Sequence, residues 1–250
     1  MLEIKEVSFS YHRERCVLRD VSWKVESTYI RVGIVGENGS GKSTLLKSMA
    51  RILLPRKGSI IYNGRDLKTF SSRELSKLIS FLGPANSLDL QIPVLELVKF
   101  GRYPYLSFMA PLNKEDLRVI DWALDITDMT NFKHKLLSEL SSGEMQRARL
   151  ARALAQDTNI LLLDEPTTFL DPRHWVKLLR VLKEVSLHRL VIVASHDLSF
   201  LRLFAEHILC LKEGSIVYDG SPGLFWDSPS FTSAFGVEPE KLKTGLRPVE

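Results

Sequence analysis

The sequence Gly36-Glu-Asn-Gly-Ser-Gly-Lys-Ser-Thr44 decides the fold of this chain. It fits the pattern of a glycine, four residues and Gly-Lys-Ser/Thr that a phosphate-binding loop requires. An apolar run, Ile30 to Val35, precedes the loop, and an amphipathic run, Leu45 to Leu54, follows it. The alternative is a glycine-rich turn without a ligand. A buried strand before the loop and a helix after it favour a site for a nucleoside triphosphate.

The residue types of this loop suit phosphate chemistry. The glycines let the backbone curl so that successive N–H groups point at phosphate oxygens, and the next helix adds the positive end of its dipole. Lys42 supplies a charge for the β and γ phosphates, and Ser43 supplies a hydroxyl ligand for Mg²⁺. We expect nucleotide contacts from the whole loop: Gly36, Glu37, Asn38, Gly39, Ser40, Gly41, Lys42, Ser43 and Thr44.

Composition limits the class of protein. With 250 residues, 44% of them hydrophobic, the chain can form one large domain with an ample core. Its net charge of +4 comes without a basic cluster, which argues against nucleic acid as a partner. Two cysteines, Cys16 and Cys210, predict no disulfide framework and favour a reducing cytosol. No apolar run approaches the length of a membrane span, so at a membrane another chain would do the spanning.

Two patterns predict a sheet-containing core. Alternation over residues 2–10 and 17–25, and a hairpin with Asn63-Gly64 as its two-residue turn, predict an N-terminal antiparallel β subdomain. Short apolar strands alternating with helices predict a mostly parallel sheet covered on both faces. The expected strands of that sheet are Ile79–Leu82, Ile160–Leu163, Leu190–Ala194, Ile208–Leu211 and Ile216–Tyr218.

A helical stretch interrupted by prolines separates parts of this core. Within it Leu117, Ile120 and Leu124 have the spacing of one buried helix face. We expect a single domain in which residues 1–83 and 158–226 form the α/β core. Residues 84–157 form an inserted helical subdomain, and residues 227–250 form a polar C-terminal tail.

The strand at residues 160–163 ends in two acids, Asp164 and Glu165. The carboxyl end of a parallel strand is where such sheets bind ligands. Asp164 can hold Mg²⁺, in part through water, opposite Ser43, while Glu165 can polarise an attacking water. The alternative is a solvated strand end, which is less common for two acids after four apolar residues. No guanine-selecting Asn-Lys-x-Asp sequence is present, so ATP is favoured over GTP.

Residues 140–144, Leu-Ser-Ser-Gly-Glu, and the run 145–154 resemble the signature motif and helix of ATP-binding cassette (ABC) ATPases. The resemblance spans roughly residues 2 to 226 and implies the P-loop NTPase (RecA-like) fold. A serine and a backbone N–H at a helix N-terminus make a second phosphate cradle. In that family the cradle serves ATP bound to a second protomer, which implies a homodimer with two composite sites. The residues of this trans signature are Ser141, Ser142, Gly143 and Glu144.

Three further matches are implied by the same resemblance. Asp171, after Phe169-Leu170, resembles the D-loop residue that crosses the dimer interface. His196, between Ser195 and Asp197, resembles the switch histidine, which touches the γ-phosphate and holds Glu165 and the water in place. Tyr11 resembles the aromatic residue that stacks on adenine. Without the resemblance, a solvated histidine and an ordinary strand-end tyrosine would be the simpler interpretations.

The chain also departs from the family pattern. Ser142 and Glu144 replace the usual glycine and glutamine, and both are expected to weaken cross-dimer ATP binding somewhat. Pro84 stands where the family has a glutamine that contacts Mg²⁺ and water, and proline can do none of this chemistry. Asn86, Gln91 or a water molecule are the candidate replacements. Our hypothesis is that ATP still binds and is hydrolysed, with looser coupling between the helical subdomain and the γ-phosphate.

The order of short motifs between residues 93 and 124 resembles the importer ATPases that serve iron–siderophore, haem and cobalamin uptake. Tyr103, Tyr105, Phe108 and Met109 make an apolar loop that can line the groove for a membrane subunit's coupling helix. The alternative for each of them is a side chain packed on its own subdomain.

The resemblance therefore implies an ATP-binding and ATP-hydrolysing importer subunit, cytoplasmic and peripheral on the inner face of the membrane. Its cofactors are ATP and Mg²⁺, and its partners are a second protomer, permease subunits and, indirectly, a substrate-binding protein. Three alternatives stay open: an importer ATPase for a free metal ion, a soluble ABC ATPase outside transport, and a weakly hydrolysing regulatory cassette.

Overall fold

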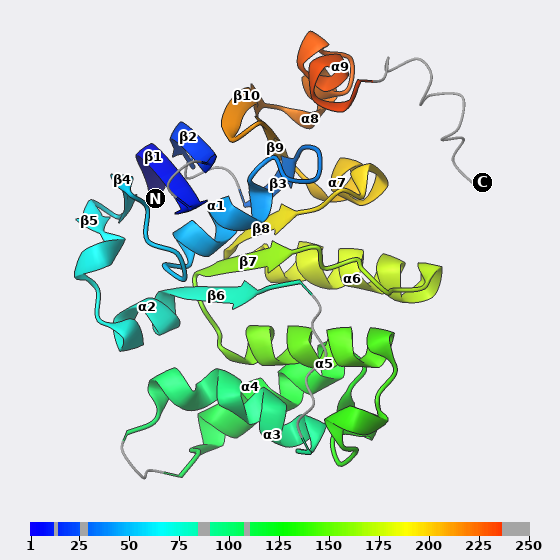
Figure 1. The fold of residues 1–250 in the computed structure, drawn as a ribbon. Coiled ribbons are helices and arrows are strands. Elements are labelled where there is room, and N and C mark those ends of the chain that lie inside the picture. Colours follow the sequence, from blue (N-terminus) through cyan, green and yellow to red (C-terminus); the bar gives the residue numbers. More distant parts are fainter. Residues whose placement is uncertain (13–14, 26–29, 85–90, 108–110, 237–250) are drawn as a thin grey trace. The chain divides into compact units, whose positions relative to one another are not determined.

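The computed structural model describes residues 1–12, 15–25, 30–84, 91–107 and 111–236. The chain divides into two compact units. The first unit comprises Met1–Lys68 and Ala194–Glu250, and the second comprises Thr69–Val193. The predicted α/β class, with parallel strands and a separate antiparallel β sheet, is confirmed (Figure 1). Asn86, Phe108, Met109 and most of the predicted tail lie outside the described residues.

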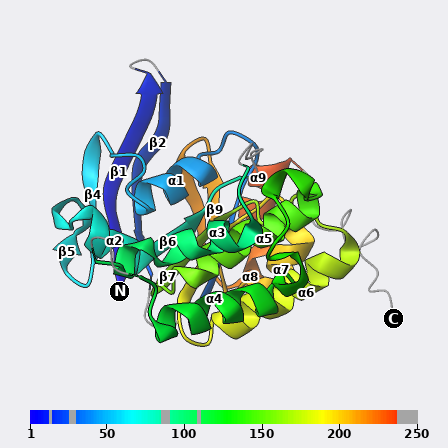
Figure 2. The ribbon, with the colours of Figure 1, turned by 90° about the horizontal axis from the view of Figure 1, so that it is seen from below.

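The first unit contains an antiparallel sheet with strand order β2-β1-β4-β5. Its strands are β1 (Leu2–His12), β2 (Arg15–Lys24), β4 (Lys57–Tyr62) and β5 (Arg65–Asp66). Tyr62 pairs with Arg65, which confirms the two-residue turn. The long β1–β2 pair is seen in Figure 2. The buried positions change from even to odd numbers between Ile4 and Val7, because a register irregularity with Glu6 at a φ of 49° adds one residue there.

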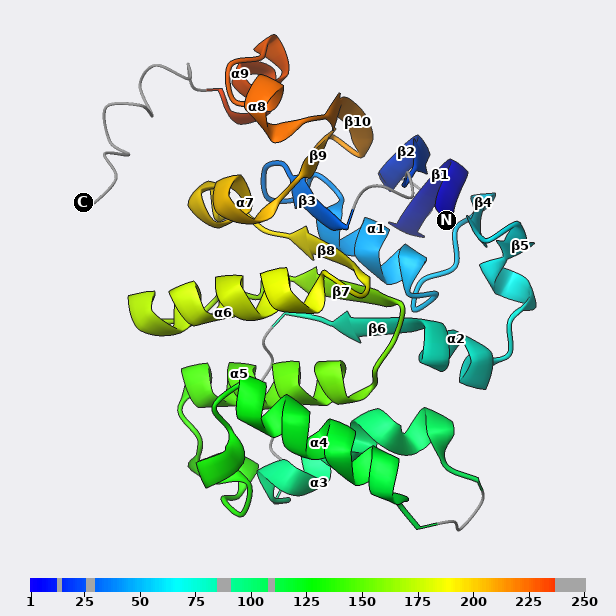
Figure 3. The same cartoon turned by 180° about the vertical axis from the view of Figure 1, so that it is seen from behind.

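A second set of strands in the first unit has the order β10-β9-β3. Here β3 (Arg31–Val35) runs parallel to β9 (His207–Lys212), and β10 (Ser215–Gly220) runs antiparallel to β9. The phosphate loop begins directly after β3 and leads into α1 (Lys42–Met49). The remaining helices of this unit are α7 (Leu198–Phe204), α8 (Pro222–Phe225) and α9 (Pro229–Phe235). Helices α8 and α9 pack on β9 and β10 (Figure 3).

The second unit is built on the strand order β8-β7-β6. Its strands are β6 (Ile79–Leu82), β7 (Ile160–Asp164) and β8 (Leu190–Ala194), the last residue of β8 being the first of the other unit. Strands β6 and β7 are parallel, with Leu82 opposite Leu163. Every residue of β7 is buried, which explains its continuous apolar sequence. Helix α6 (Pro172–Val185) buries an apolar stripe of Leu178, Val181, Leu182 and Val185.

Helices dominate the rest of the second unit. They are α2 (Ser72–Leu78), α3 (Val94–Lys99), α4 (Lys114–Ile126) and α5 (Ser142–Ala155), with short 3-10 turns η2 (Phe100–Tyr105), η3 (Thr130–Phe132) and η4 (Leu137–Glu139). The turn η1 (Leu67–Thr69) precedes them along the chain. Helices α3 and α4 both pack on α5 (Figures 1 and 3). None of the helices in the described ranges is both long and apolar enough to cross a membrane.

The predicted buried face of α4 is partly wrong. Ile120 and Leu124 are buried as expected, but the side chain of Leu117 is 46% exposed. The acidic residue before it, Asp116, is buried instead, because it forms an ion pair with the buried guanidinium of Arg102. A buried charge is tolerated where it is paired and hydrogen-bonded, so a carboxylate replaces a leucine at the start of the helix.

Candidate functional site

The phosphate loop joins β3 to α1 in the first unit. Gly36 has a φ of 145°, and a Cβ added there would lie 2.2 Å from the carbonyl oxygen of Leu211. Gly41 has a φ of 106°, and an added Cβ would lie 2.9 Å from the Cδ2 atom of Leu18. Both the backbone conformation and the close approach exclude a side chain at these two positions. The loop is therefore held tightly against β2 and β9.

The lysine of the loop is almost fully buried. Lys42 is 6% exposed, and its Nζ donates hydrogen bonds to the carbonyl oxygens of Gly36 at 2.8 Å and Glu37 at 3.0 Å. Beside it, Ser40 is 4% exposed, and its hydroxyl has no hydrogen-bond partner among the described residues. A buried polar group without a partner calls for a ligand or water. The loop thus brings the ammonium group of Lys42 close to a Ser40 hydroxyl that has no hydrogen-bond partner among the described residues.

A hollow of about 600 Å³ opens beside this loop. Tyr11 borders it, half exposed, with its hydroxyl 3.3 Å from the Oγ1 atom of Thr44 and its ring edge-on to Phe9. The hollow is lined by Tyr11, Cys16, Val17, Arg19, Gly39, Gly41, Lys42, Ser43, Thr44 and Glu213. Sequence reasoning missed the contributions of β2 and of Glu213, since no motif marks them. The turn after β9 reaches the loop through a hydrogen bond from the Gly214 N–H to the Ser40 carbonyl, 3.0 Å long.

His196 also belongs to the first unit and is exposed. The residue before it, Ser195, donates its N–H to the carbonyl of Ile34 in β3 at 3.2 Å. Ile34 lies two positions before Gly36, the first residue of the phosphate loop. The side chain of Asp197 caps α7 by accepting from the N–H of Phe200 at 2.9 Å. This cap and the Ser195–Asp197 hydrogen bond fix the turn on which the imidazole stands.

The two acids lie in the second unit, at the end of β7. Asp164 is fully buried, whereas Glu165 is partly exposed and has a φ of 51°. A left-handed conformation is uncommon for a residue other than glycine and tends to occur at functional sites. The N–H of Thr168 donates to the Glu165 carbonyl at 3.3 Å, which closes the turn. The chain therefore turns sharply at the second acid.

The predicted signature residues begin α5. Ser141 is the N-cap: its Oγ accepts from the N–H of Glu144, and its own N–H donates to the Glu144 Oε2 atom at 2.8 Å. The Ser141 backbone hydrogen bond is the main reason that the pKa of Glu144 lies below its usual value. Ser142 and Gly143, the next two residues, have no intrahelical acceptor for their N–H groups. The carboxylate of Glu144 is therefore held at the helix end where an anion would bind.

The predicted D-loop residue Asp171 caps α6. Its Oδ1 accepts from the N–H of His174 at 2.8 Å, and the Nδ1 atom of the same histidine lies 2.9 Å away. These hydrogen bonds lower the pKa of Asp171. Two residues earlier, Phe169 is 61% exposed with a φ of 66°. A Cβ added at Gly143 would lie 3.3 Å from the Phe169 carbonyl, so signature and D-loop of one chain lie close together in the second unit.

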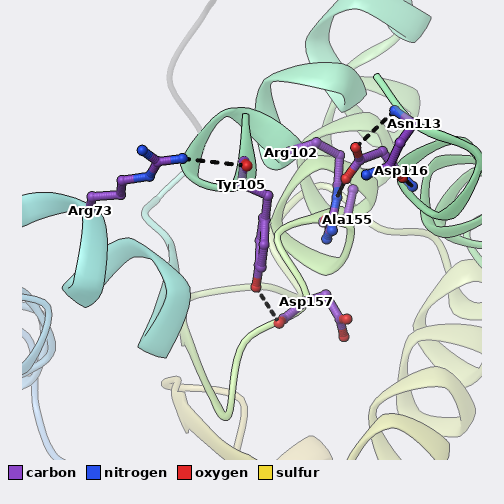
Figure 4. A network of polar contacts seen from close by, with 7 residues as sticks. All are labelled: Arg73, Arg102, Tyr105, Asn113, Asp116, Ala155 and Asp157. Carbon is purple, nitrogen blue, oxygen red and sulfur yellow. Dashed lines mark hydrogen bonds and ion pairs between the residues drawn. The ribbon is translucent and has the colours of Figure 1, made fainter. Parts of the chain in front are cut away.

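The loop after α3 is pinned by a polar network, which Figure 4 shows. Arg102 bonds to Asp116 at 2.8 Å and to the Ala155 carbonyl at 3.0 Å, and its guanidinium lies 4.0 Å from the centre of the Tyr105 ring. The Tyr105 hydroxyl donates to the Asp157 carbonyl at 2.9 Å. The side chain of Tyr105 therefore packs on its own unit, which is the alternative to lining a groove for a coupling helix. Tyr103 is 59% exposed.

The segment after β6 contains the proline that departs from the family pattern. Pro84 is exposed, and its carbonyl accepts from the guanidinium of Arg149 in α5 at 3.0 Å. Gln91, a candidate replacement, is exposed, and its Oε1 accepts from the Ser138 hydroxyl at 3.2 Å. The structure therefore places the phosphate loop, Tyr11 and His196 in the first unit, and places the acids, signature, Asp171 and Pro84 in the second.

Comparison with known proteins identifies relatives that match between 76% and 99% of this chain. The family profile described as ABC transporter matches residues 18–168. The petrobactin import ATP-binding protein FpuC of Bacillus anthracis is 36% identical over 250 residues, which cover 99% of this chain and 91% of that protein. The iron(3+)-hydroxamate import ATP-binding protein FhuC of Bacillus subtilis is 35% identical, with 83% and 78% covered. The ferric enterobactin transport ATP-binding protein FepC of Escherichia coli is 38% identical, with 76% and 70% covered.

Solved structures of ABC proteins have a similar fold. A dimeric ATP-binding cassette in a post-hydrolysis state, bound to ADP and Pi, matches with a TM-score of 0.77 and 27% identity. The match covers 88% of this chain and 98% of that one. An inward-facing putative metal-chelate type ABC transporter matches with a TM-score of 0.79 and 24% identity, with 95% and 89% covered.

Proposed function

This chain belongs to the ABC transporter family, and we propose that it is the ATP-binding and ATP-hydrolysing subunit of an importer for an iron chelate. The observation that carries the proposal is the phosphate loop. Two glycines admit no Cβ, the ammonium of Lys42 is held over the loop carbonyls, and the loop borders a hollow of about 600 Å³. This arrangement fits a nucleoside triphosphate.

The loop and its neighbours bind ATP in this proposal. The N–H groups of the loop and the start of α1 take the phosphates, and Lys42 exchanges the Gly36 and Glu37 carbonyls for phosphate oxygens. The hydroxyl of Ser40 supports such a ligand, because it has no hydrogen-bond partner within the described part of the chain and would gain one. Tyr11, half exposed beside the hollow, stacks on the adenine.

Hydrolysis requires positioned groups rather than covalent chemistry. Ser43 and Asp164 are the residues that would hold Mg²⁺, in part through water, and the ion would supply charge neutralisation. Glu165 orients the attacking water and accepts its proton, and His196 keeps the water and Glu165 in place. The fully buried Asp164 and the left-handed Glu165 support these different roles.

The second protomer completes each site. We infer that the N–H groups of Ser142 and Gly143 bind the phosphates of ATP held by a second copy of this chain, so that two copies enclose two nucleotides. Asp171 and the exposed Phe169 lie on the segment that would meet the partner. A similar cassette with dimeric structure, 27% identical, supports this assembly.

The relatives support a proposal for the cargo and for the other partners. Three relatives are named for petrobactin, iron(3+)-hydroxamate and ferric enterobactin. Two of these names state iron together with its carrier, which supports an iron chelate as the cargo. We propose that this chain docks on permease subunits at the inner face of the membrane and depends on a substrate-binding protein. Uptake of radioactive iron in these three chelate forms, measured before and after deletion of the gene, tests the cargo. Unchanged uptake of all three would remove the iron-chelate assignment.

ATP binding is tested by calorimetry and steady-state hydrolysis on the purified chain. We expect Lys42→Ala to weaken ATP binding at least tenfold and to abolish hydrolysis, because its charge is lost from the phosphates. Lys47→Ala, on the same helix, is the matched control and is expected to behave as the parent chain. A parent chain that binds no ATP would refute the proposal. Binding without turnover would favour the regulatory-cassette alternative that Pro84 motivates.

A further inference from the structure

The segment that leaves β6 is held by one arginine of α5. Arg149 Nη2 donates to the carbonyl of Gly83 at 3.1 Å and to the carbonyl of Pro84 at 3.0 Å. Proline has neither an N–H group nor a polar side-chain atom, so its carbonyl is the one polar group through which residue 84 can be held. Burial and the neighbouring Arg152 lower the pKa of Arg149, but an arginine keeps its charge in proteins. These are therefore charge-assisted hydrogen bonds.

The same guanidinium reaches a buried glutamine one turn back on α5. Arg149 Nη1 donates to the Oε1 atom of Gln146 at 3.3 Å. Gln146 is 2% exposed, and its Nε2 donates to the carbonyl of Pro166 at 3.3 Å. The amide orientation follows from these partners, because its oxygen must face the donor and its nitrogen the acceptor. Pro166 is the residue immediately after Glu165.

A continuous series of hydrogen bonds therefore runs from the Pro84 carbonyl through Arg149 and Gln146 to the Pro166 carbonyl. All four residues lie in the second unit. Both outer ends are main-chain carbonyls, so the series connects backbone to backbone across α5. The series joins Pro84, the position at which the family has a glutamine, to the turn that carries Glu165.

We propose that Arg149 and Gln146 are positioning residues that hold the turn of Glu165 in register with the segment leaving β6. The inference rests on the proposed function, in which Glu165 orients the attacking water. The two residues transmit displacements of the Pro84 segment to that water through the backbone. A polar side chain at position 84 is then unnecessary for the coupling. On this proposal the series, rather than Gln91, compensates for Pro84, whereas Asn86 lies outside the described residues.

The chain offers a matched control in Arg152. It lies three residues further along α5, and its Nη2 donates to the Phe81 carbonyl of β6 at 3.3 Å. Its pKa is also lowered by burial, so both arginines are partly desolvated. The contacts of the described residues give it no hydrogen bond to Gln146 or Pro166. Replacing Arg152 removes a hydrogen bond from α5 to a main-chain carbonyl of β6 and leaves the series intact.

The test compares variants of the full purified chain by steady-state ATP hydrolysis and thermal unfolding. We expect Arg149→Gln and Gln146→Met each to lower kcat by about tenfold or more, with KM for ATP within about twofold of the parent value. Because both act in one series, the double variant should be no slower than the slower single variant. Arg149→Lys should restore part of kcat, since lysine keeps the charge but lacks the fork. Arg152→Gln should keep kcat within about twofold while lowering Tm as Arg149→Gln does.

Each opposite result has a distinct meaning. An equal loss of kcat in Arg152→Gln and Arg149→Gln, or additive losses in the double variant, would reduce the series to structural support and overturn the inference. A fully active Arg149→Gln in an active parent would overturn it as well, with the proposed function intact. A parent chain no more active than Lys42→Ala would remove the proposed function, and this inference with it. If Arg149→Gln fails to fold, Gln146→Met and Arg149→Lys decide by their kcat and KM.

Discussion

Arg102 and Asp116 form a buried ion pair in the second unit, with 2.8 Å between Nε and Oδ1 and with 5% and 3% of the side chains exposed. The carboxylate also accepts from the N–H of Asn113, and the guanidinium also donates to the Ala155 carbonyl. One pair thus fastens the start of α4, the turn η2 and the end of α5 to one another (Figure 4).

Removing one partner of this pair should destabilise the chain strongly. We expect Arg102→Met to lower the free energy of unfolding by about 3–5 kcal/mol, because it leaves the buried charge of Asp116 without a counter-charge. The double variant Arg102→Met/Asp116→Leu should recover most of that loss. Urea unfolding followed by circular dichroism measures both. A double variant as unstable as the single one would show that the pair matters through its hydrogen bonds to the backbone.

Glu165→Gln should separate ATP binding from hydrolysis. The amide keeps the shape of the side chain but cannot accept a proton, so kcat is expected to fall by about 10²- to 10⁴-fold. ATP affinity should stay near that of the parent chain. Size-exclusion chromatography with ATP and Mg²⁺ should then reveal a trapped dimer. Hydrolysis at the parent rate would show that Glu165 is not the base.

Glu144→Gln should strengthen the ATP-dependent dimer. The Glu144 carboxylate stands at the N-terminus of α5, where the phosphate of a partner's ATP would bind, and two anions there repel each other. Removing the charge is expected to lower the ATP concentration needed for dimer formation several-fold. A dimer that needs more ATP would indicate that the capping contribution of Glu144 outweighs its charge.

The same variant has a predictable pH dependence of stability. The pKa of Glu144 is lower in the folded chain than the ordinary value of about 4.3, so the ionised side chain stabilises the fold above that ordinary value. This contribution is lost as the pH falls through the lowered pKa. Glu144→Gln should therefore have a lower Tm than the parent at pH 7 and nearly the same Tm at the acid end of the range. A Tm difference that stays constant on acidification would contradict this.

The two cysteines should differ sharply in reactivity. Burial raises the pKa of Cys210 to about 12, so almost none of its reactive thiolate is present at pH 8. Cys16 is exposed and lines the hollow beside the phosphate loop. A disulfide-forming thiol reagent should therefore modify Cys16 rapidly and Cys210 only after unfolding, and ATP should slow the reaction. Loss of the rapid phase in Cys16→Ser is the control, and an ATP-independent rate would place the nucleotide elsewhere.

Tyr11 should contribute to affinity through its ring. Tyr11→Ala is expected to weaken ATP binding by about 1–3 kcal/mol, the value of an aromatic stack on a base. Tyr11→Phe should cost little, because the hydrogen bond of the hydroxyl to Thr44 among the described residues is a long one of 3.3 Å. Isothermal titration with ATP measures both. Equal losses in the two variants would assign the effect to the hydroxyl.

Local sequence patterns predict local structure well. They do not predict the features that depend on contacts between residues far apart in the sequence. The turn at Asn63-Gly64 and the apolar strand β7 follow from neighbouring residues alone. The burial of Asp116 in place of Leu117 depends on an arginine 14 residues away, which a pattern of hydrophobicity does not contain. The link from Pro84 to Arg149 spans 65 residues and becomes visible only when β6 and α5 are in place. The site motifs were readable because each occupies a few consecutive residues, whereas the groups that hold them are scattered.

The hydrogen bonds around Gly214 have a consequence for the order of events during synthesis. Its N–H holds the Ser40 carbonyl, and its own carbonyl accepts from the N–H of Arg19 at 2.9 Å. On the ribosome the phosphate loop emerges early, but the backbone that supports it is translated some 170 residues later. A nascent chain therefore cannot hold ATP in its final geometry until β9 and the following turn have emerged. Nucleotide can assist only the last stage of folding, and premature termination before this turn yields a chain with every motif and no finished pocket.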